Sequence, residues 1–204
     1  GPTLATPSPK GAGFPAWYRD KKGVALDQCF TDAVSIEPGA LAASMCAPLF
    51  PNPAAFPGNW GPELFYSSAV SQMTLAGGQP ALLVLALEGA YMTNVPKAGD
   101  ETVFSRIRVR ARTLPDGMYR ITHPYGVEIL YAFNGKGVDW TRDVGFSPQM
   151  FDLALNGDIA PFLQWGDQFG QPMTVKAVSP STGQTEEFLG DPNVLHTITG
   201  SPNN

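Results

Sequence analysis

The sequence is poor in charge and lacks long apolar runs, and each shortage excludes a class of function. Charged residues make up 15% of the 204 residues, with 13 basic against 18 acidic side chains and a net charge of −5. Binding to a phosphate backbone depends on many lysines and arginines that release counterions, so no nucleic acid partner is expected. The longest apolar run, residues 81–92, contains Glu88 and is too short to cross a bilayer as a helix, so no transmembrane segment is expected.

Recognisable catalytic motifs are also absent. The chain contains no P-loop, no dinucleotide-binding glycine fingerprint, no GxSxG elbow and no HExxH pair. Only two histidines, His123 and His196, are available to a catalytic triad or a metal site. These absences favour a non-catalytic protein, with a hydrolase as an alternative.

Glycine and proline, in contrast, are abundant. The 22 glycines and 20 prolines interrupt long helices and favour strands joined by turns, while a hydrophobic content of 43% suffices for a packed core. We therefore predict an all-β, sandwich-like fold of the Ig-like, Greek-key or jelly-roll kind, with one short helix and an irregular N-terminal third. Residues 1–16 are expected to form a flexible leader whose opening Gly-Pro resembles a tag remnant, followed by a single β-rich domain over residues 17–202.

Alternating apolar residues and turn signals predict the individual strands. "ELFYSSAVSQMTL" and "PALLVLALEGAYM" flank the turn "AGGQP" and predict a hairpin, and "GDETVFSRIRVRA", "VEILYAF" and "VDWTRDVG" predict further strands. The one helix is expected to start with Ser147 as N-cap and Pro148 in its first turn, and to stop at Asn156 and Gly157.

A stripe of arginines stands out in "RIRVRAR". Arg106, Arg108, Arg110 and Arg112 recur at every second residue, so they share one face of a strand. The stripe is interpreted either as an ordinary solvated sheet face or as an anion-binding surface.

Aromatic side chains are a second candidate for binding. Trp60 in "PGNWGPE" and Tyr125 in "HPYGVE" lie in loop-like contexts, where an exposed ring would offer a platform for sugar or peptide. We expect these two rings, together with Arg106, Arg108 and Arg110, to form the binding residues.

No cofactor is expected, but a divalent metal is an alternative. His123 and His196 with Asp191 would make a transition-metal site if the strands bring them together, with Asp143 or Glu128 as further ligands. Loop carboxylates would instead suit calcium, although no EF-hand spacing is present; the candidates are Asp139, Asp143 and Asp158.

Two further hypotheses concern the pair of cysteines and the one Asp-Pro bond. A disulfide between Cys29 and Cys46 would close a loop in a proline-rich segment and would indicate an oxidising compartment, with two free thiols as the alternative. At the bond between Asp191 and Pro192, the Asp carboxylate can attack its own carbonyl carbon and expel the prolyl nitrogen. Self-processing modules use this cleavage, although a simple turn explains the same residues.

Two resemblances to known proteins indicate a β-rich fold. Leu114, Pro115, Gly117 and Tyr119 resemble the tyrosine corner of immunoglobulin-like and fibronectin-like sandwiches. The spaced blocks "FPAWYRDKKGVALDQC", "VFSRIRVRA", "YRITHPYGVE", "FLQW" and "GDPNVLHTITGSP" resemble a module of large bacterial extracytoplasmic proteins. That resemblance covers most of residues 14–202 and implies a β-rich unit of a longer polypeptide, with no catalytic residue.

The sequence therefore predicts an extracytoplasmic interaction or structural module of a larger protein that is secreted, periplasmic or on the cell surface. Its expected partners are a protein or carbohydrate at the cell surface and further domains of the same polypeptide. The alternatives are a histidine-dependent metal-binding domain and a hydrolase or self-processing module.

Overall fold

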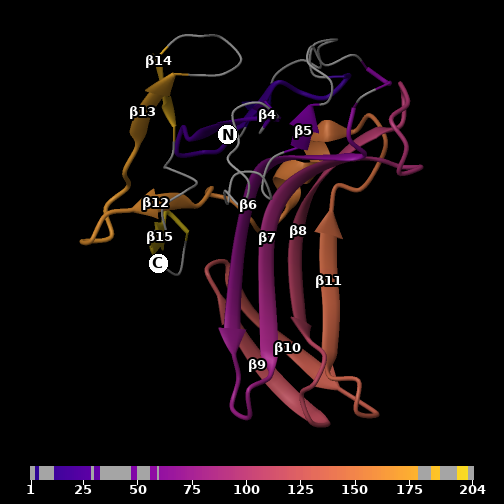
Figure 1. Cartoon of the computed structure of the whole chain (residues 1–204), viewed down its shortest axis with the longest axis vertical. Coiled ribbons are helices and arrows are strands. Elements are labelled where there is room, and N and C mark those ends of the chain that lie inside the picture. Colours follow the sequence, from indigo (N-terminus) through magenta and orange to yellow (C-terminus); the bar gives the residue numbers. More distant parts are fainter. Residues whose placement is uncertain are drawn as a thin grey trace.

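The computed structural model describes residues 3–4, 12–28, 30–32, 47–49, 56–58, 60–178, 185–188 and 197–201. They form a mostly β structure with one short helix, which confirms the predicted fold class (Figure 1). The elements are β1 (Thr3–Leu4), β2 (Trp17–Arg19), β3 (Ala25–Asp27), β4 (Phe30–Asp32), β5 (Ala47–Leu49), β6 (Glu63–Thr74), β7 (Pro80–Tyr91), β8 (Glu101–Ala111), β9 (Gly117–His123), β10 (Gly126–Ala132), β11 (Val138–Val144), the 3₁₀ helix η2 (Phe151–Asn156), β12 (Gln164–Gly166), β13 (Val175–Val178), β14 (Thr185–Phe188) and β15 (Thr197–Thr199).

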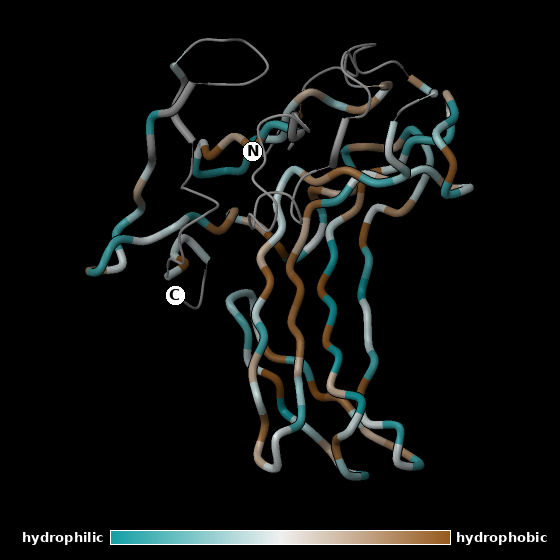
Figure 2. Tube along the Cα trace, in the orientation of Figure 1, coloured by the Kyte–Doolittle hydropathy of each residue, from teal (hydrophilic) through white to brown (hydrophobic). Residues whose placement is uncertain are grey.

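A four-stranded antiparallel sheet with the order β11-β8-β7-β6 is the centre of the fold. The predicted hairpin is confirmed as β6 and β7, and its turn uses Gly77 and Gly78 at φ of 90° and 81°, angles that favour glycine. Hydrophilic and hydrophobic residues alternate along β8, whereas β7 is more continuously hydrophobic (Figure 2). The period of two gives the sheet two different faces.

The hairpin of β9 and β10 forms a second layer over one half of this sheet, behind the lower part of the sheet in Figure 1. A small core fills the space between the layers; its buried members are Val109, Leu130, Ala132 and Val138. The Tyr119 hydroxyl donates to the upstream Pro115 carbonyl at 2.8 Å. The lower half of the molecule is thus two β layers with an apolar core between them.

A larger core covers the other half of the same sheet face. Phe14 and Tyr18 are fully buried there and pack with the inner side of β7 and β8 and with η2, and the Tyr18 hydroxyl donates to the Phe151 carbonyl at 2.9 Å. The expected flexible leader therefore needs correction over its last residues: Ala12, Phe14 and Pro15 are buried, so the core begins before Trp17. Apolar side chains in this proline-rich stretch lose water contact by joining the core.

The predicted start of the helix is wrong. η2 begins at Phe151 with Met150 as N-cap and no side-chain cap, and it is a 3₁₀ helix. Ser147 donates its N–H to the Thr102 hydroxyl at 2.9 Å, and Gln149, at φ of 62°, donates to the Glu101 carbonyl. The segment is thus tied to the start of β8, which removes the helical geometry expected at Ser147.

Within the part of the chain that the structure describes, no helix is long and apolar enough to span a membrane.

Candidate interaction surfaces

The arginine stripe lies on the sheet face opposite to both cores. Ile107 and Val109 are buried at 2% and 4% exposure, and the arginines between them point to the other side, as the period of two predicts. We call this side the arginine face; it carries Arg106, Arg108 and Arg110, flanked on β11 by Asp143, Thr141 and Asp139 in register.

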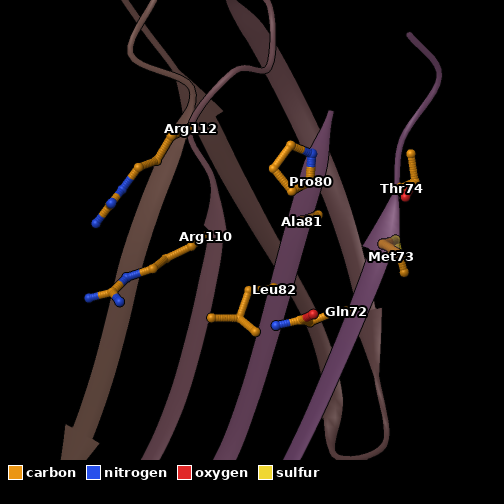
Figure 3. Close-up of a pocket in the computed structure, with 8 residues that line it drawn as sticks. All are labelled: Gln72, Met73, Thr74, Pro80, Ala81, Leu82, Arg110 and Arg112. Atoms are coloured by element: carbon orange, nitrogen blue, oxygen red, sulfur yellow. The ribbon is translucent and has the colours of Figure 1, made fainter. Parts of the chain in front are cut away.

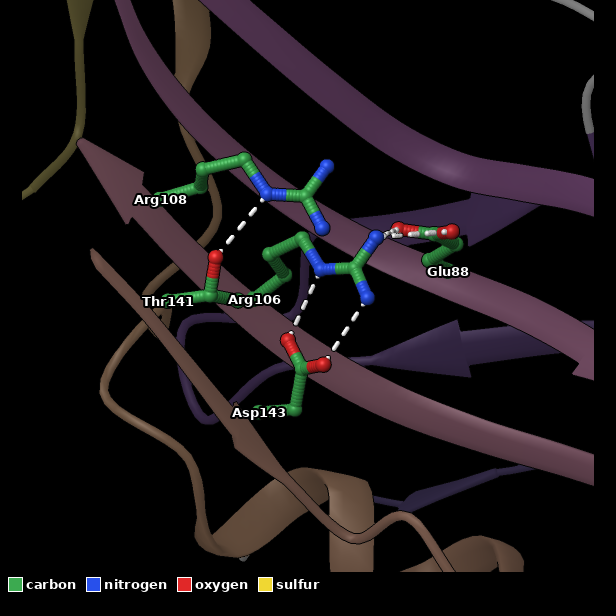
Figure 4. Close-up of polar contacts among 5 residues, drawn as sticks. All are labelled: Glu88, Arg106, Arg108, Thr141 and Asp143. Carbon is green, nitrogen blue, oxygen red and sulfur yellow. Dashed lines mark hydrogen bonds and ion pairs between the residues drawn. The ribbon is translucent and has the colours of Figure 1, made fainter. Parts of the chain in front are cut away.

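Arg106 is held by two carboxylates. Its Nη1 lies 2.9 Å from Glu88 Oε2, and its Nε and Nη2 each donate to Asp143 at 2.8 Å (Figure 4). The Arg106 and Glu88 side chains are 14% and 3% exposed, so this is a largely buried ion pair. Breaking such a pair is costly, because removing one partner leaves the charge of the other buried without compensation.

Burial and ion pairing shift the pKa values of Glu88 and Arg106 in opposite directions. Burial raises the pKa of Glu88 to about 7, although the positive charge of Arg106 opposes the rise. Burial also lowers the pKa of Arg106, but its hydrogen bond to Asp143 and the charge of Glu88 outweigh that effect and leave its pKa raised. Arg106 therefore stays charged, while Glu88 changes its protonation near neutral pH.

The outer part of the stripe is also bridged to β11. Arg110 Nε lies 3.1 Å from Asp139 Oδ1, and Arg112 donates from Nε to Asp139 Oδ2 at 2.8 Å. The hydrogen bond from Arg112 is the main cause that lowers the pKa of Asp139. Arg108 differs, because its Nε donates to the Thr141 hydroxyl at 3.0 Å and not to a carboxylate.

A hollow of about 400 Å³ opens at the end of this face (Figure 3). Gln72, Leu82 and Arg110 line it from three neighbouring strands in register. The full lining is Gln72, Met73, Thr74, Pro80, Ala81, Leu82, Arg110 and Arg112. Two arginines therefore line one side of the hollow, and a mixture of apolar and uncharged polar side chains lines the rest.

The outer side of the β9–β10 hairpin is exposed and apolar. Tyr131 and Phe133 stack with ring centroids 5.8 Å apart, and Met118 lies opposite Tyr131 on the neighbouring strand. We call this side the hairpin face; its large members and their exposed fractions are Met118 (65%), Val127 (41%), Ile129 (48%), Tyr131 (55%) and Phe133 (62%). Sequence reasoning predicted the strand but missed the face.

His123 lies inside the fold and not in a pocket. It is 4% exposed, its Nδ1 accepts the Tyr125 N–H at 3.2 Å, and its Nε2 lies 3.5 Å from Glu128 Oε1. Glu128 also pairs with Arg142 at 2.9 Å, which in turn pairs with Asp158. The histidine thus lies at the buried end of a polar chain that joins β9, β10 and β11 and becomes exposed at Arg142 and Asp158.

The other candidate metal ligands either pair with arginines or lie outside the described residues. Asp139, Asp143 and Asp158 each pair with an arginine, and no group of three histidine, cysteine, aspartate or glutamate side chains suited to a metal occurs among the described residues. His196 and Asp191 lie outside the described residues, as do Pro192, Cys29 and Cys46.

Neither predicted aromatic is an exposed platform. Trp60 is 9% exposed and belongs to the main core, so the expectation that its ring lies on the surface is corrected. Tyr125 is partly buried, and its hydroxyl donates to the Pro161 carbonyl at 2.8 Å. Trp60 is thus part of the main core, and Tyr125 packs against it.

Comparisons with protein-family models, with curated proteins and with solved structures found no match for this chain.

Proposed function

We propose that this chain is a non-catalytic interaction module of a larger protein that is secreted, periplasmic or on the cell surface. The observation that carries the proposal is the hairpin face, where five large apolar side chains on one ribbon are 41–65% exposed. Contiguous exposed apolar surface is costly in water and marks sites where another macromolecule docks. His123, buried beside Glu128, supports the non-catalytic assignment because a substrate has no access to it.

The chemistry of the hairpin face favours a protein as its partner. Of the five large members of this face only Tyr131 carries a hydrogen-bonding side-chain group, whereas carbohydrate recognition needs several. Arg120 is the one charged side chain on this side of the two strands, since Glu128 points inward to Arg142. The complementary partner is an apolar protein surface with a carboxylate opposite Arg120, such as a further domain of the same polypeptide.

The extracytoplasmic location rests on the resemblance described above and on the cysteine pair. A disulfide between Cys29 and Cys46 is part of the proposal, and the hydroxyl contact of Tyr119 supports an immunoglobulin-like relationship for the two layers. An intact mass lower than that of the reduced chain by two hydrogen atoms is the expected sign of the disulfide.

Photo-cross-linking tests the docking surface. With benzoylphenylalanine at Phe133 in the full-length protein on the cells that make it, we expect a cross-link to a defined apolar protein surface. Phe169, which is 77% exposed in a distant turn, is the matched control position and is expected to give no such product. Reversing the charge with Arg120→Glu should lower the cross-link yield about fivefold, because it opposes the partner's carboxylate.

Equal products from positions 133 and 169, or a yield that does not respond to Arg120→Glu, would contradict the proposal. A product that depends on Arg120 and maps to one partner surface would support it.

A further inference from the structure

Arg108 lies at the centre of the arginine face with one of its two hydrogen-bonding edges in use. Its Nε donates to the Thr141 hydroxyl at 3.0 Å, which occupies the side of the guanidinium. The two terminal nitrogens point away from Thr141 (Figure 4), and within the described residues neither of them contacts a carboxylate. This end edge has the shape that binds both oxygens of a carboxylate.

The carboxylates are unevenly shared among the arginines of the face. Glu88 and Asp143 both pair with Arg106, and Asp139 is shared by Arg110 and Arg112. Among the described residues of this ladder, Arg108 is therefore the guanidinium without a carboxylate partner. Burial, together with the charges of Arg106 and Arg110, lowers the pKa of Arg108, as expected for a cation surrounded by like charges.

The surroundings of this charge are apolar on the side away from β11. Val84 is the β7 neighbour of Arg108, and Val70, 52% exposed, lies beyond it on β6. One step further along the strands, Leu82 and Arg110 border the hollow. A ligand that places an anion on Arg108 therefore also covers apolar surface and reaches a cavity.

We propose that Arg108 and the adjoining hollow bind an extended acidic peptide, with an aspartate or glutamate on the Arg108 end edge and an apolar side chain in the hollow. Side chains on one face of an extended chain repeat at about 6.6 Å, which is also the step from Arg108 to Arg110 along β8. The side chain two positions from the acid therefore falls over the hollow. This site lies on the opposite side of the two layers from the hairpin face, so it does not depend on the proposed function.

Two short capped peptides test the site. Both alternate threonine with apolar residues and place leucine two positions from the central residue, which is aspartate in one and asparagine in the other. Titration of ¹⁵N-labelled protein should show the aspartate peptide binding at least about tenfold more tightly, with shifts in the Arg108 side-chain signal. This comparison requires no protein variant, so it stands even where a substitution on β8 impairs folding.

Two protein variants test whether Arg108 is the residue that binds the acidic side chain of the peptide. Arg108→Gln should weaken the aspartate peptide about tenfold and remove its advantage over the asparagine peptide. Lys136→Gln, which removes the same charge from an exposed turn, should change the affinity less than about twofold. Equal binding of the two peptides, or an unchanged affinity for Arg108→Gln, would overturn the proposal. Displacement of the peptide by an equal concentration of sulfate would overturn the assignment to a peptide and leave a bare anion site.

Discussion

Replacing Arg106 by methionine is expected to lower the free energy of unfolding by an amount that reaches about 3–5 kcal/mol well above pH 7, where Glu88 is ionised in the wild type. Methionine fills a similar volume but leaves the Glu88 carboxylate, 3% exposed, buried without its cation. It also removes the two hydrogen bonds to Asp143. Urea unfolding of the two proteins over a range of pH measures the loss.

The loss should depend on pH in a defined direction. The folded-state pKa of Glu88, about 7, lies above its ordinary value of 4.5, so Glu88 itself stabilises the fold below about 4.5 and that contribution is lost as the pH rises through 7. Without Arg106 the carboxyl resists ionisation further. The difference between wild type and Arg106→Met is therefore smallest below the folded-state pKa, where Glu88 is neutral in both folded proteins, and grows above it.

Two controls separate the buried pair from general loss of charge. Arg110→Met removes an arginine from the same strand whose bridge to Asp139 is 38% and 41% exposed, and such pairs contribute at most about 1 kcal/mol. Adding Glu88→Gln to Arg106→Met should remove the dependence on pH above neutrality. Equal losses for Arg106→Met and Arg110→Met would refute the buried ion pair as the anchor of this face.

Replacing Phe14 by alanine is expected to lower the free energy of unfolding by about 3–5 kcal/mol. Phe14 is fully buried, with its ring 5.2 Å from that of Tyr91 and 6.4 Å from that of Phe151. Its edge also lies against Gly89, where an added Cβ would come within 3.1 Å of it. The cavity left by alanine would be enclosed by these groups, and thermal or urea unfolding measures its cost.

Phe169→Ala is the control for Phe14→Ala. Its ring is 77% exposed, so we expect a change within about 0.5 kcal/mol. If the two alanine variants unfold alike, residues 12–16 do not contribute to the core.

Local patterns were sufficient to predict the strands of the central sheet. The turn at Gly77 and Gly78 and the alternation around Ile107 are encoded within a few residues, so the hairpin and the face of the arginines followed from the sequence. The hydroxyl contact of Tyr119 to Pro115 is equally local, since it spans one turn of chain.

Features that depend on distant residues could not be predicted in the same way. Whether each arginine has a carboxylate partner on β11 depends on the register of β8 with β11. This register aligns Arg106 with Asp143 and Arg108 with Thr141. The loop-like context of Trp60 predicts an exposed ring, but the core into which Trp60 packs comes from other segments.

The hairpin face was missed for a different reason. The residues "VEILYAF" are apolar on both alternations except for Glu128, so the period of two does not tell which side of the strand is buried. The buried side of the strand is the one that carries Leu130 and Ala132, because these residues pack against Val109 and Val138 across the layers. Ile129, Tyr131 and Phe133 are then left outside.

Oxidation of Met118 by peroxide, compared between the isolated chain and the full-length protein on the cells that make it, tests the docking surface most directly. Met118 is 65% exposed on the hairpin face, and Met150, 49% exposed and remote from it, is the internal reference. We predict that both oxidise readily in the isolated chain and that Met118 alone is protected, about fivefold or more, where the partner is present. Oxidation of Met118 at the same rate in both settings would contradict an interaction module that docks through its hairpin face.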